Sequence, residues 1–147
     1  MKVQDILRAK GDNANRCATV QPDATVDTVS HRLKLEGCGA LVVSSDGERV
    51  EGIVSERDIV RGLPEHGGRL LDMPVSDIMT REVQTCSPGD NVTEIMGEMT
   101  RRRIRHLPVT EDGKLSGIIS IGDVVKNRLD ELETETHVLR DYIVGRS

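Results

Sequence analysis

The 147-residue sequence contains no phenylalanine, no tryptophan and only one tyrosine, Tyr142. Proteins that bind single-stranded nucleic acids stack the bases on aromatic side chains, so this chain lacks the residues for that kind of binding. Its 20 basic and 25 acidic residues give a net charge of −5, which repels polyanions. We therefore expect no nucleic-acid partner.

Cysteine is also scarce, since the sequence contains only Cys17, Cys38 and Cys86. Their number is odd, and no two of them form a CxxC pair. The four histidines have no spacing typical of metal ligands, so we expect no metal site. A chain of this length buries roughly 68–70% of its unfolded surface and needs neither disulfides nor a structural metal. We interpret each cysteine as a small, reduced apolar side chain.

Long apolar runs are missing too, and a typical run, from Ala40 to Val43, spans only a few residues. A membrane-spanning helix needs about 20 apolar residues. The N-terminal sequence MKVQDILRAKGD lacks the apolar segment of a secretory signal. We therefore expect no membrane association and a cytoplasmic location.

What the sequence does contain is an internal repeat. Four blocks recur in the same order: VQDIL (Val3) as VSDIM (Val75), TVQPDATVDTV (Thr19) as TCSPGDNVTEI (Thr85), LVVSSDG (Leu41) as LPVTEDG (Leu107), and GIVSERDIV (Gly52) as GIISIGDVV (Gly117). We assign residues 1–65 to the first copy, 66–74 to a connector, 75–130 to the second copy and 131–147 to a C-terminal helical extension.

Each copy is predicted to fold as β-α-β-β-α. Apolar residues at three- and four-residue steps predict helices over residues 26–36 and 92–102. The Asp-Gly pairs at 46–47 and 112–113 predict hairpin turns, and a second helix begins with the Ser-x-x-Asp segment. One copy alone would bury little core, so we expect both to pack with pseudo-twofold symmetry into one α/β (α+β) unit with a C-terminal helix.

The paired copies, the Asp-Gly hairpins and the segments GIVSERD and GIISIGD resemble a tandem pair of cystathionine-beta-synthase (CBS) domains, the Bateman module. The resemblance covers Val3 to about Leu129. It implies a regulatory module, not an enzyme, that binds an adenosine-containing ligand. AMP, ATP and NAD(H) are the first candidates, with ADP and S-adenosylmethionine also in the family's range. A homodimer and a client protein are the implied partners.

Two acidic residues carry the expected ligand contacts. Ser55 and Asp58 lie three residues apart at the start of a predicted helix, and Ser120 and Asp123 repeat this arrangement. In the family the acid binds the ribose hydroxyls, and the serine approaches the ribose or phosphate. The helix N-terminus also attracts anions. The alternative is plain helix capping, for which Ser and Asp are preferred without any ligand.

The resemblance also implies an apolar slot for adenine, which must be aliphatic here because Phe and Trp are absent. The remaining candidates are Thr19 and Thr85, placed near the base or phosphate, the slot residues Val20, Leu41, Ile53, Cys86, Leu107 and Ile118, and Pro108. The alternative is that the slot residues are ordinary core residues, apolar with or without a ligand.

The two copies differ just before their second strand. Arg105 and His106 of the second copy stand opposite Gly39 and Ala40 of the first. Basic residues at these positions resemble the family's phosphate contacts, and Arg57 is a further candidate. We therefore expect two pockets of unequal charge. A solvated basic stretch, complementing the C-terminus of the preceding helix, is the alternative.

Two other functions stay open. The chain could be a structural or interaction scaffold with empty pockets, or an enzyme acting on a phosphorylated substrate. The second is disfavoured because the sequence has no Ser-His-Asp motif, Walker segment or metal-ligand cluster.

The C-terminal helix carries an apolar stripe at four- and three-residue steps. Its members are Val125, Leu129, Leu132, Thr136, Leu139 and Ile143. The stripe packs against its own domain in one interpretation and meets a second subunit or a client in the other. Two and a half heptads are too few to predict a free-standing coiled coil.

Overall fold

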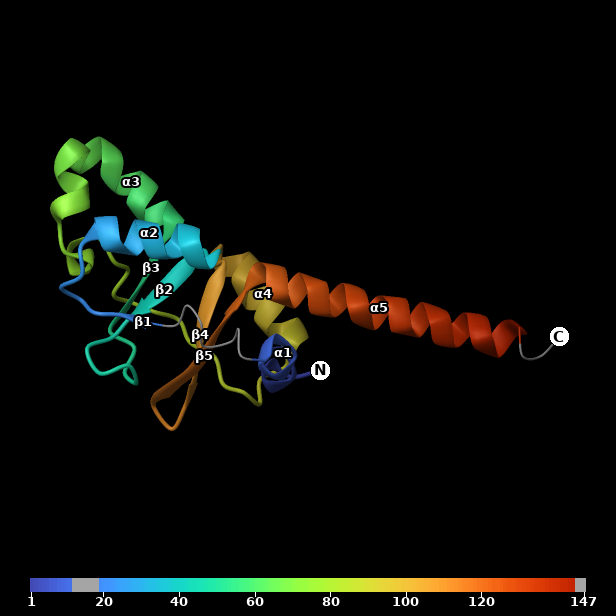
Figure 1. Cartoon of the computed structure of the whole chain (residues 1–147). Helices are drawn as coiled ribbons and strands as arrows, with labels where there is room; N and C mark the ends of the chain where they lie inside the picture. The colour runs from blue at the N-terminus through green and yellow to red at the C-terminus, as the bar shows by residue number, and fades with distance from the viewer. Residues whose placement is uncertain (12–18, 145–147) are drawn as a thin grey trace.

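The computed structural model describes residues 1–11 and 19–144, so Cys17 lies outside the described residues. Figure 1 shows the arrangement of the helices and strands. In chain order they are α1 (Val3–Lys10), β1 (Thr19–Val20), α2 (Val26–Glu36), β2 (Ala40–Val43), β3 (Gly52–Ser55), α3 (Glu56–His66), the 3-10 helices η2 (Gly67–Asp72) and η3 (Val75–Asp77), α4 (Val92–Arg102), β4 (His106–Glu111), β5 (Lys114–Ser120) and α5 (Ile121–Val144).

The predicted mixed α and β architecture is confirmed. In the first copy, β2 lies between β1, to which it is parallel, and β3, to which it is antiparallel. In the second copy, β4 and β5 form an antiparallel pair. The first strand of that copy is reduced to a single parallel bridge between Cys86 and Val109. Helices α2 and α4 have the predicted bounds.

The two predicted hairpin turns differ. Asp112 (φ 53°) and Gly113 (φ 77°) form a tight two-residue turn between β4 and β5, since both adopt the left-handed conformation that this turn needs. In the first copy, residues 44–51 form a wider loop. There Asp46 Oδ1 accepts hydrogen bonds from the backbone N–H groups of Arg49 and Glu48, which lower the pKa of Asp46 to about 2. The predicted hairpin between β2 and β3 is present, but its connection is wider than the one at Asp112 because the Asp46 side chain organises a longer loop.

The opening segment of each copy is exchanged onto the other copy. The backbone N–H of Val3 donates to the carbonyl of Asp90 (3.0 Å), and that of Val75 donates to the carbonyl of Ala24 (2.7 Å). These bonds correspond under the repeat, since Val3 aligns with Val75 and Asp90 with Ala24. Helix α1 therefore belongs to the first copy in sequence but packs against the second copy in the structure.

The exchanged segments complete the opposite hydrophobic cores. Val3 and Ile6 of α1 are buried in one cluster with Ile95 of α4. Val75 is buried in the other with Val29 of α2. Each core thus contains side chains from both copies, and neither core is complete without the other copy.

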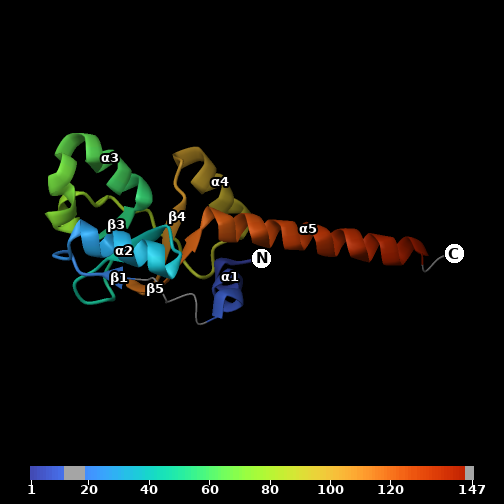
Figure 2. The same cartoon turned by 45° about the horizontal axis from the view of Figure 1, so that its top comes forward.

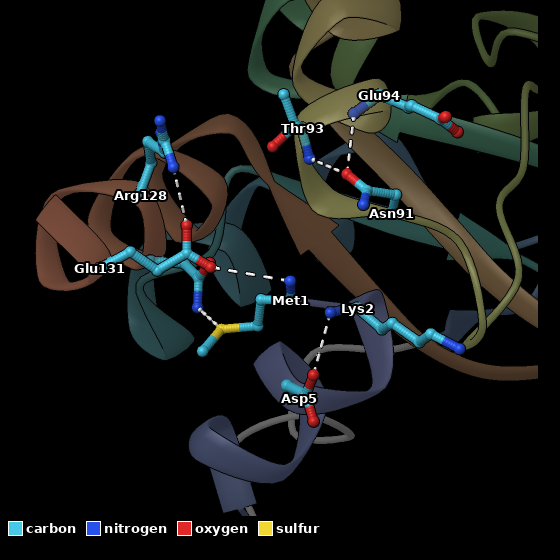
Figure 3. Close-up of polar contacts among 9 residues, drawn as sticks. Met1, Lys2, Asp5, Asn91, Thr93, Glu94, Arg128 and Glu131 are labelled. Carbon is cyan, nitrogen blue, oxygen red and sulfur yellow. Dashed lines mark hydrogen bonds and ion pairs between the residues drawn. The ribbon is translucent and has the colours of Figure 1, made fainter. Parts of the chain in front are cut away.

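Figure 3 shows the exchange at the N-terminus, where Lys2 lies beside Asn91. The Lys2 N–H donates to Asp5 Oδ2 (2.9 Å) at the start of α1. Asn91 Oδ1 accepts from the backbone N–H of Thr93 (2.8 Å) at the start of α4. Two helices that are far apart in sequence therefore begin side by side.

The two sheets meet in a smaller apolar cluster of Ala40 and Val42 from β2 and Ile118 from β5. The predicted connector is itself packed: α3 extends to His66, and Leu70 of η2 is fully buried. Burial of Leu70 ties the connector to the first copy, so the two copies are joined by structured chain.

Helix α5 leaves the domain as a long arm (Figures 1 and 2). Its 24 residues form one continuous helix across the predicted boundary at residue 130. Val124 near its start is fully buried, whereas Leu129, Leu139 and Ile143 are exposed. No helix among residues 1–11 and 19–144 combines the length and the apolar character needed to cross a membrane.

The exchange depends on two close approaches at matching glycines. A Cβ on Gly117 of β5 would lie 2.8 Å from Leu7 Cδ2 of α1, and one on Gly52 of β3 would overlap the sulfur of Met79. We expect Gly117→Ala to lower the free energy of unfolding by about 1–3 kcal/mol, because the Leu7 side chain must leave its packed position. Urea denaturation measures this.

Gly89→Ala is the matched control, since nothing lies within 4 Å of the added methyl group. Its stability should stay within about 0.5 kcal/mol of the wild type. Combining Gly117→Ala with Leu7→Ala removes the obstacle, so the two losses should not add. Strict additivity would contradict this account of the close approach.

Candidate functional site

Both acidic residues singled out from the sequence cap the helix that they begin. The Ser55 N–H donates to Asp58 Oδ2 (2.8 Å), and the Ser120 N–H donates to Asp123 Oδ2 (2.9 Å). These bonds satisfy backbone donors that the helix leaves unpaired. Capping is therefore present at both acids. Capping does not use all the acceptor sites of these carboxylates, because a carboxylate can accept about four hydrogen bonds.

A cavity of about 280 Å³ opens beside Asp58 at the start of α3. Both copies and the chain between them contribute to its wall, which consists of Gly39, Ile53, Ser55, Glu56, Arg57, Asp58, Arg61, Thr80, Glu82, Val83, Gln84, Arg103, Ile104, Arg105 and His106. Six predicted ligand residues meet here: Ile53, Ser55, Arg57, Asp58, Arg105 and His106. We call this the Asp58 cavity.

A larger hollow of about 800 Å³ follows α4. It includes the predicted residues Thr85 and Leu107 but neither Asp58 nor Asp123. Its wall is formed mostly by one side of α4. It contains no acidic residue that, like Asp58 and Asp123, occurs at the start of a helix in both copies. The Asp58 cavity is therefore the better candidate for a ligand site.

Four arginines make the Asp58 cavity basic. Arg57 and Arg61 come from α3, and Arg103 and Arg105 from the junction between α4 and β4. None of these four side chains has a hydrogen bond or an ion pair with another described residue. Three acidic side chains share the wall, so the arginines outnumber them. Unpaired guanidinium groups are suited to bind a phosphate in a bidentate manner.

Arg103 adopts a left-handed backbone conformation (φ 55°) at the end of α4. The matching residue at the end of α2 is Gly37, also left-handed (φ 65°). This conformation costs a residue other than glycine about 1–2 kcal/mol. The second copy thus accepts local strain at a position where the first has glycine, and the side chain that results lines the Asp58 cavity.

His106 lies against the first copy across the cavity. A Cβ on Gly39 would lie only 2.9 Å from His106 Nε2, so the imidazole occupies space that a side chain at that position would need. Burial lowers the pKa of His106 below its ordinary value of 6.5, although Asp123 and Glu56 favour the charged form. His106 is therefore neutral at pH 7 in the free protein.

Asp123 is engaged differently from Asp58. Lys10 Nζ at the end of α1 donates to Asp123 Oδ2 (2.9 Å) and to the carbonyl of Ile118 (3.0 Å). Burial, the largest single effect, raises the pKa of Asp123, but hydrogen bonds from Lys10 and Ser120 outweigh it and hold the pKa below 3.8. In the other copy, Thr80 Oγ1 donates to Asp58 Oδ1 (3.4 Å).

The structure gives most of the predicted adenine-slot residues core positions. Val20 and Leu41 are buried in the core of the first copy, and Cys86 and Leu107 in that of the second. Burial raises the pKa of the Cys86 thiol to about 12, and Asp90 adds to the effect, as expected for a reduced apolar side chain. Leu41 is fully buried, so the structure places it inside the core and not on a cavity wall.

The other predicted residues lie outside the Asp58 cavity. Ile118 packs between the two sheets, and Pro108 is buried beside it in sheet register. Thr19 is half-buried on β1, and Thr85 is exposed. Ser120 stands with Asp123 at the start of α5. Apolar side chains that do line the Asp58 cavity are Ile53, Val83 and Ile104.

Sequence reasoning missed several residues of the candidate sites. Lys10 and Thr80 reach the two acids from the ends of the exchanged segments, which the repeat alone does not reveal. In the sequence, Arg61 has the pattern of an exposed helix charge, and Arg103 that of a solvated basic stretch. Arg103 did have a signal, because it replaces the helix-ending glycine of the other copy.

The CBS domain family matches the chain twice, over residues 14–65 and 75–130. The chain belongs to the CBS-domain family. It is 36% identical over 151 residues to the CBS domain-containing protein CBSX3, mitochondrial, of Arabidopsis thaliana, covering 97% of this chain and 72% of the relative. That relative is named for its CBS domains and not for an enzymatic activity.

Two solved CBS-domain structures resemble this one closely. The CBS-domain containing protein ATU1752 from Agrobacterium tumefaciens has a TM-score of 0.80 and 42% identity, covering 87% of this chain and 99% of that one. The CBS domain protein PAE2072 from Pyrobaculum aerophilum, solved in complex with AMP, has a TM-score of 0.74 and 28% identity, covering 92% and 99%. The tandem CBS arrangement expected from the repeat is therefore confirmed.

The depressed pKa of His106 makes stability depend on pH. The unfolded chain protonates this histidine near pH 6.5, whereas the folded protein does so only at lower pH. The unfolded state therefore binds more protons between these values, and the free energy of unfolding falls as pH falls through 6.5, by at most about 1.4 kcal/mol per pH unit. We expect His106→Gln to reduce this slope, measured by urea denaturation between about pH 8 and 5.5.

Ala40→Ser, a change at the position that matches His106 in the first copy, should keep the wild-type slope. An identical pH profile for His106→Gln and the wild type would contradict a buried, neutral His106.

Proposed function

We propose that this chain is a regulatory, non-catalytic module that binds an adenosine-containing ligand in the Asp58 cavity and acts as a homodimer. The observation that carries the proposal is the Asp58 carboxylate at the edge of a cavity in which four unpaired arginines come from both copies. The acid provides acceptors for a ribose diol, and the guanidinium groups provide donors for phosphate. The AMP complex of the Pyrobaculum aerophilum relative supports the same ligand class.

The lining of the cavity favours a phosphorylated ligand. AMP, ADP, ATP and NAD(H) all carry negative charge that the arginines would balance, whereas S-adenosylmethionine carries a cationic sulfonium group. The aliphatic side chains of Ile53, Val83 and Ile104 offer a surface for adenine. The volume of about 280 Å³ lies near the lower end of small-molecule sites, roughly 300–1,000 Å³.

We further propose that the site at Asp123 is the weaker of two. Its carboxylate is already paired with Lys10, so a ribose there must displace that ammonium group or share the acid with it. Among the described residues, the acid of the Asp58 cavity accepts only from the hydroxyl of Thr80 beyond its own cap. A first ligand therefore enters the Asp58 cavity.

Ligand binding would signal by drawing the two copies together. The cavity joins α3 to the residues before β4, so a ligand that contacts both favours one relative orientation. Couplings of this kind are typically about 1–3 kcal/mol. A client protein would sense the orientation, in a cytoplasmic setting consistent with three cysteines that lack CxxC spacing.

The two alternatives, an empty scaffold and an enzyme, give different results in one screen. A ligand that binds the native state raises the thermal midpoint, so AMP, ADP, ATP, NADH and S-adenosylmethionine are each tested. No shift with any of them favours the scaffold. Conversion of a nucleotide by the pure protein favours the enzyme.

Asp58→Asn tests the proposed diol acceptor. Asparagine keeps a capping oxygen for the Ser55 N–H but loses the charge, so we expect the fold to persist and the tighter binding step to weaken about 10- to 100-fold. Isothermal titration calorimetry with the ligand found in the screen measures this. Asp123→Asn should spare the tighter step, and Asp23→Asn, at an exposed position outside the cavity, serves as the control. Unchanged affinity in Asp58→Asn would contradict the assignment.

Arg103→Gly separates stability from binding. Glycine relieves the left-handed strain, so the free energy of unfolding should stay equal or rise by up to about 1 kcal/mol. Loss of the guanidinium should weaken binding of a phosphorylated ligand about 10- to 100-fold. Denaturation and calorimetry on the same preparation give both values.

Arg49→Ala is the control for net charge, because Arg49 lies in the loop between β2 and β3, away from the cavity. It should leave affinity within about twofold of the wild type. Arg103→Gly with higher stability and full affinity would show that the strain serves no ligand.

A further inference from the structure

The apolar stripe of α5 is uncovered in the structure. Five of its six residues are apolar, and these are between 42% and 67% exposed. The face of α5 that meets the domain is different: Val124 is fully buried and lies about 100° around the helix from Val125, while Asn127 and Glu131 are half-buried. The domain therefore does not cover the stripe, which excludes the first of the two interpretations made from the sequence.

The stripe has the spacing of a coiled-coil seam. Leu129, Thr136 and Ile143 take the a positions of a heptad, and Val125, Leu132 and Leu139 take the d positions. Figures 1 and 2 show that this part of α5 extends beyond the domain, so a partner helix has room along its length.

The flanking charges identify the partner. With this assignment, Arg128 and Glu135 take g positions, and Glu133 and Arg140 take e positions. In a parallel pair of identical helices, each g residue faces the e residue five positions later in the other helix. Arg128 then faces Glu133 of the other copy, and Glu135 faces Arg140 of the other copy. Both pairs are of opposite charge.

The opposite orientation does not fit a full-length overlap. In an antiparallel pair, each e position faces an e position of the other helix, and each g position faces a g position. Glu133 would then meet Glu133, and Lys126 would meet Arg140. Glu135 would also meet Glu135. These are like-charge contacts, which disfavour that arrangement.

We propose that α5 pairs in parallel with α5 of a second copy of this chain, through the stripe from Val125 to Ile143. The inference rests on the proposed homodimer and says which surface forms it. Glu133, Glu135 and Arg140 have no ion pair with another described residue, so they are available for it. Arg128 forms an ion pair with Glu131 (3.0 Å), and a surface pair of this kind contributes little to stability.

Short helices are marginal when isolated, but α5 is not isolated. Its first turn is fixed in the domain by Val124 and by the cap at Asp123, so the nucleation cost of the helix is already met. A two-and-a-half-heptad seam then needs only to hold two formed helices together. This removes the objection that the stripe is too short to be a coiled coil by itself.

The full-length chain and its variants are compared by sedimentation equilibrium over a range of concentrations. Leu139→Glu puts a charge into the seam and should raise the dimer dissociation constant at least about a hundredfold. Val138→Glu is the matched control, since both side chains are 61% exposed and Val138 lies off the stripe. It should dimerise like the wild type.

Charge reversal tests the orientation. Glu135→Arg alone should weaken the dimer roughly tenfold, because the introduced guanidinium would face Arg140 of the other copy. Adding Arg140→Glu should restore wild-type affinity. No restoration would overturn the parallel arrangement.

The remaining outcomes separate the proposals. A dimer that persists in Leu139→Glu, or that is lost equally in Val138→Glu, overturns the pairing through the stripe and leaves the homodimer standing. A wild type that is monomeric at every concentration overturns both. Nucleotide binding, measured on the same variants, is judged independently by the Asp58 experiment.

Discussion

The exchange of opening segments between the two copies is the constraint on which the rest of this structure depends. α1 completes the core around α4, and η3 completes the core around α2, through backbone bonds that repeat with the internal symmetry. Gly117 and Gly52 are the points where the exchanged chains press against the strands. Because each core needs residues from both copies, the copies cannot separate without unfolding in part. The movement that we propose for ligand binding is therefore a small change in their angle, not an opening of the molecule.

The same exchange determines what reaches the two acids. The end of each exchanged segment lies near the start of a helix in the opposite copy. Thr80, just after η3, contacts Asp58, and Lys10, the last residue of α1, contacts Asp123. A hydroxyl leaves the first carboxylate charged and open, whereas an ammonium group neutralises the second. The two acids therefore differ in two ways. Arg105 and His106 add to the basic wall of the Asp58 cavity, as the sequence indicates, and the charge of Asp123 is already balanced by Lys10.

Local features of this fold were predictable, and contacts across the repeat were not. The bounds of α2 and α4 follow from apolar spacing and from the residues that cap them, Thr25 and Asn91. The pairing of Ser55 with Asp58, and of Ser120 with Asp123, follows from helix-start chemistry. The width of the loop at Asp46 was not predicted, because its side chain competes with a tight turn. For Leu41 the sequence left both a pocket wall and a core position open, because an apolar strand residue looks the same in either place. Lys10 could not have been placed at Asp123 without knowing that α1 crosses to the other copy.

The geometry also links the second site to the arm. Asp123 lies in the first turn of α5, and one continuous helix runs from it to Val144. A helix of 24 residues is about 36 Å long, so a tilt of a few degrees at its start moves its far end by a few ångströms. Lys10 holds the first turn of α5 to the end of α1, which in turn belongs to the core of the second copy. If a ligand at Asp123 displaces Lys10, it loosens the one charged tie between α1 and α5 among the described residues near that turn. Of the two proposed sites, the one at Asp123 would therefore act on the direction of the arm, while the one at Asp58 would act on the angle between the copies.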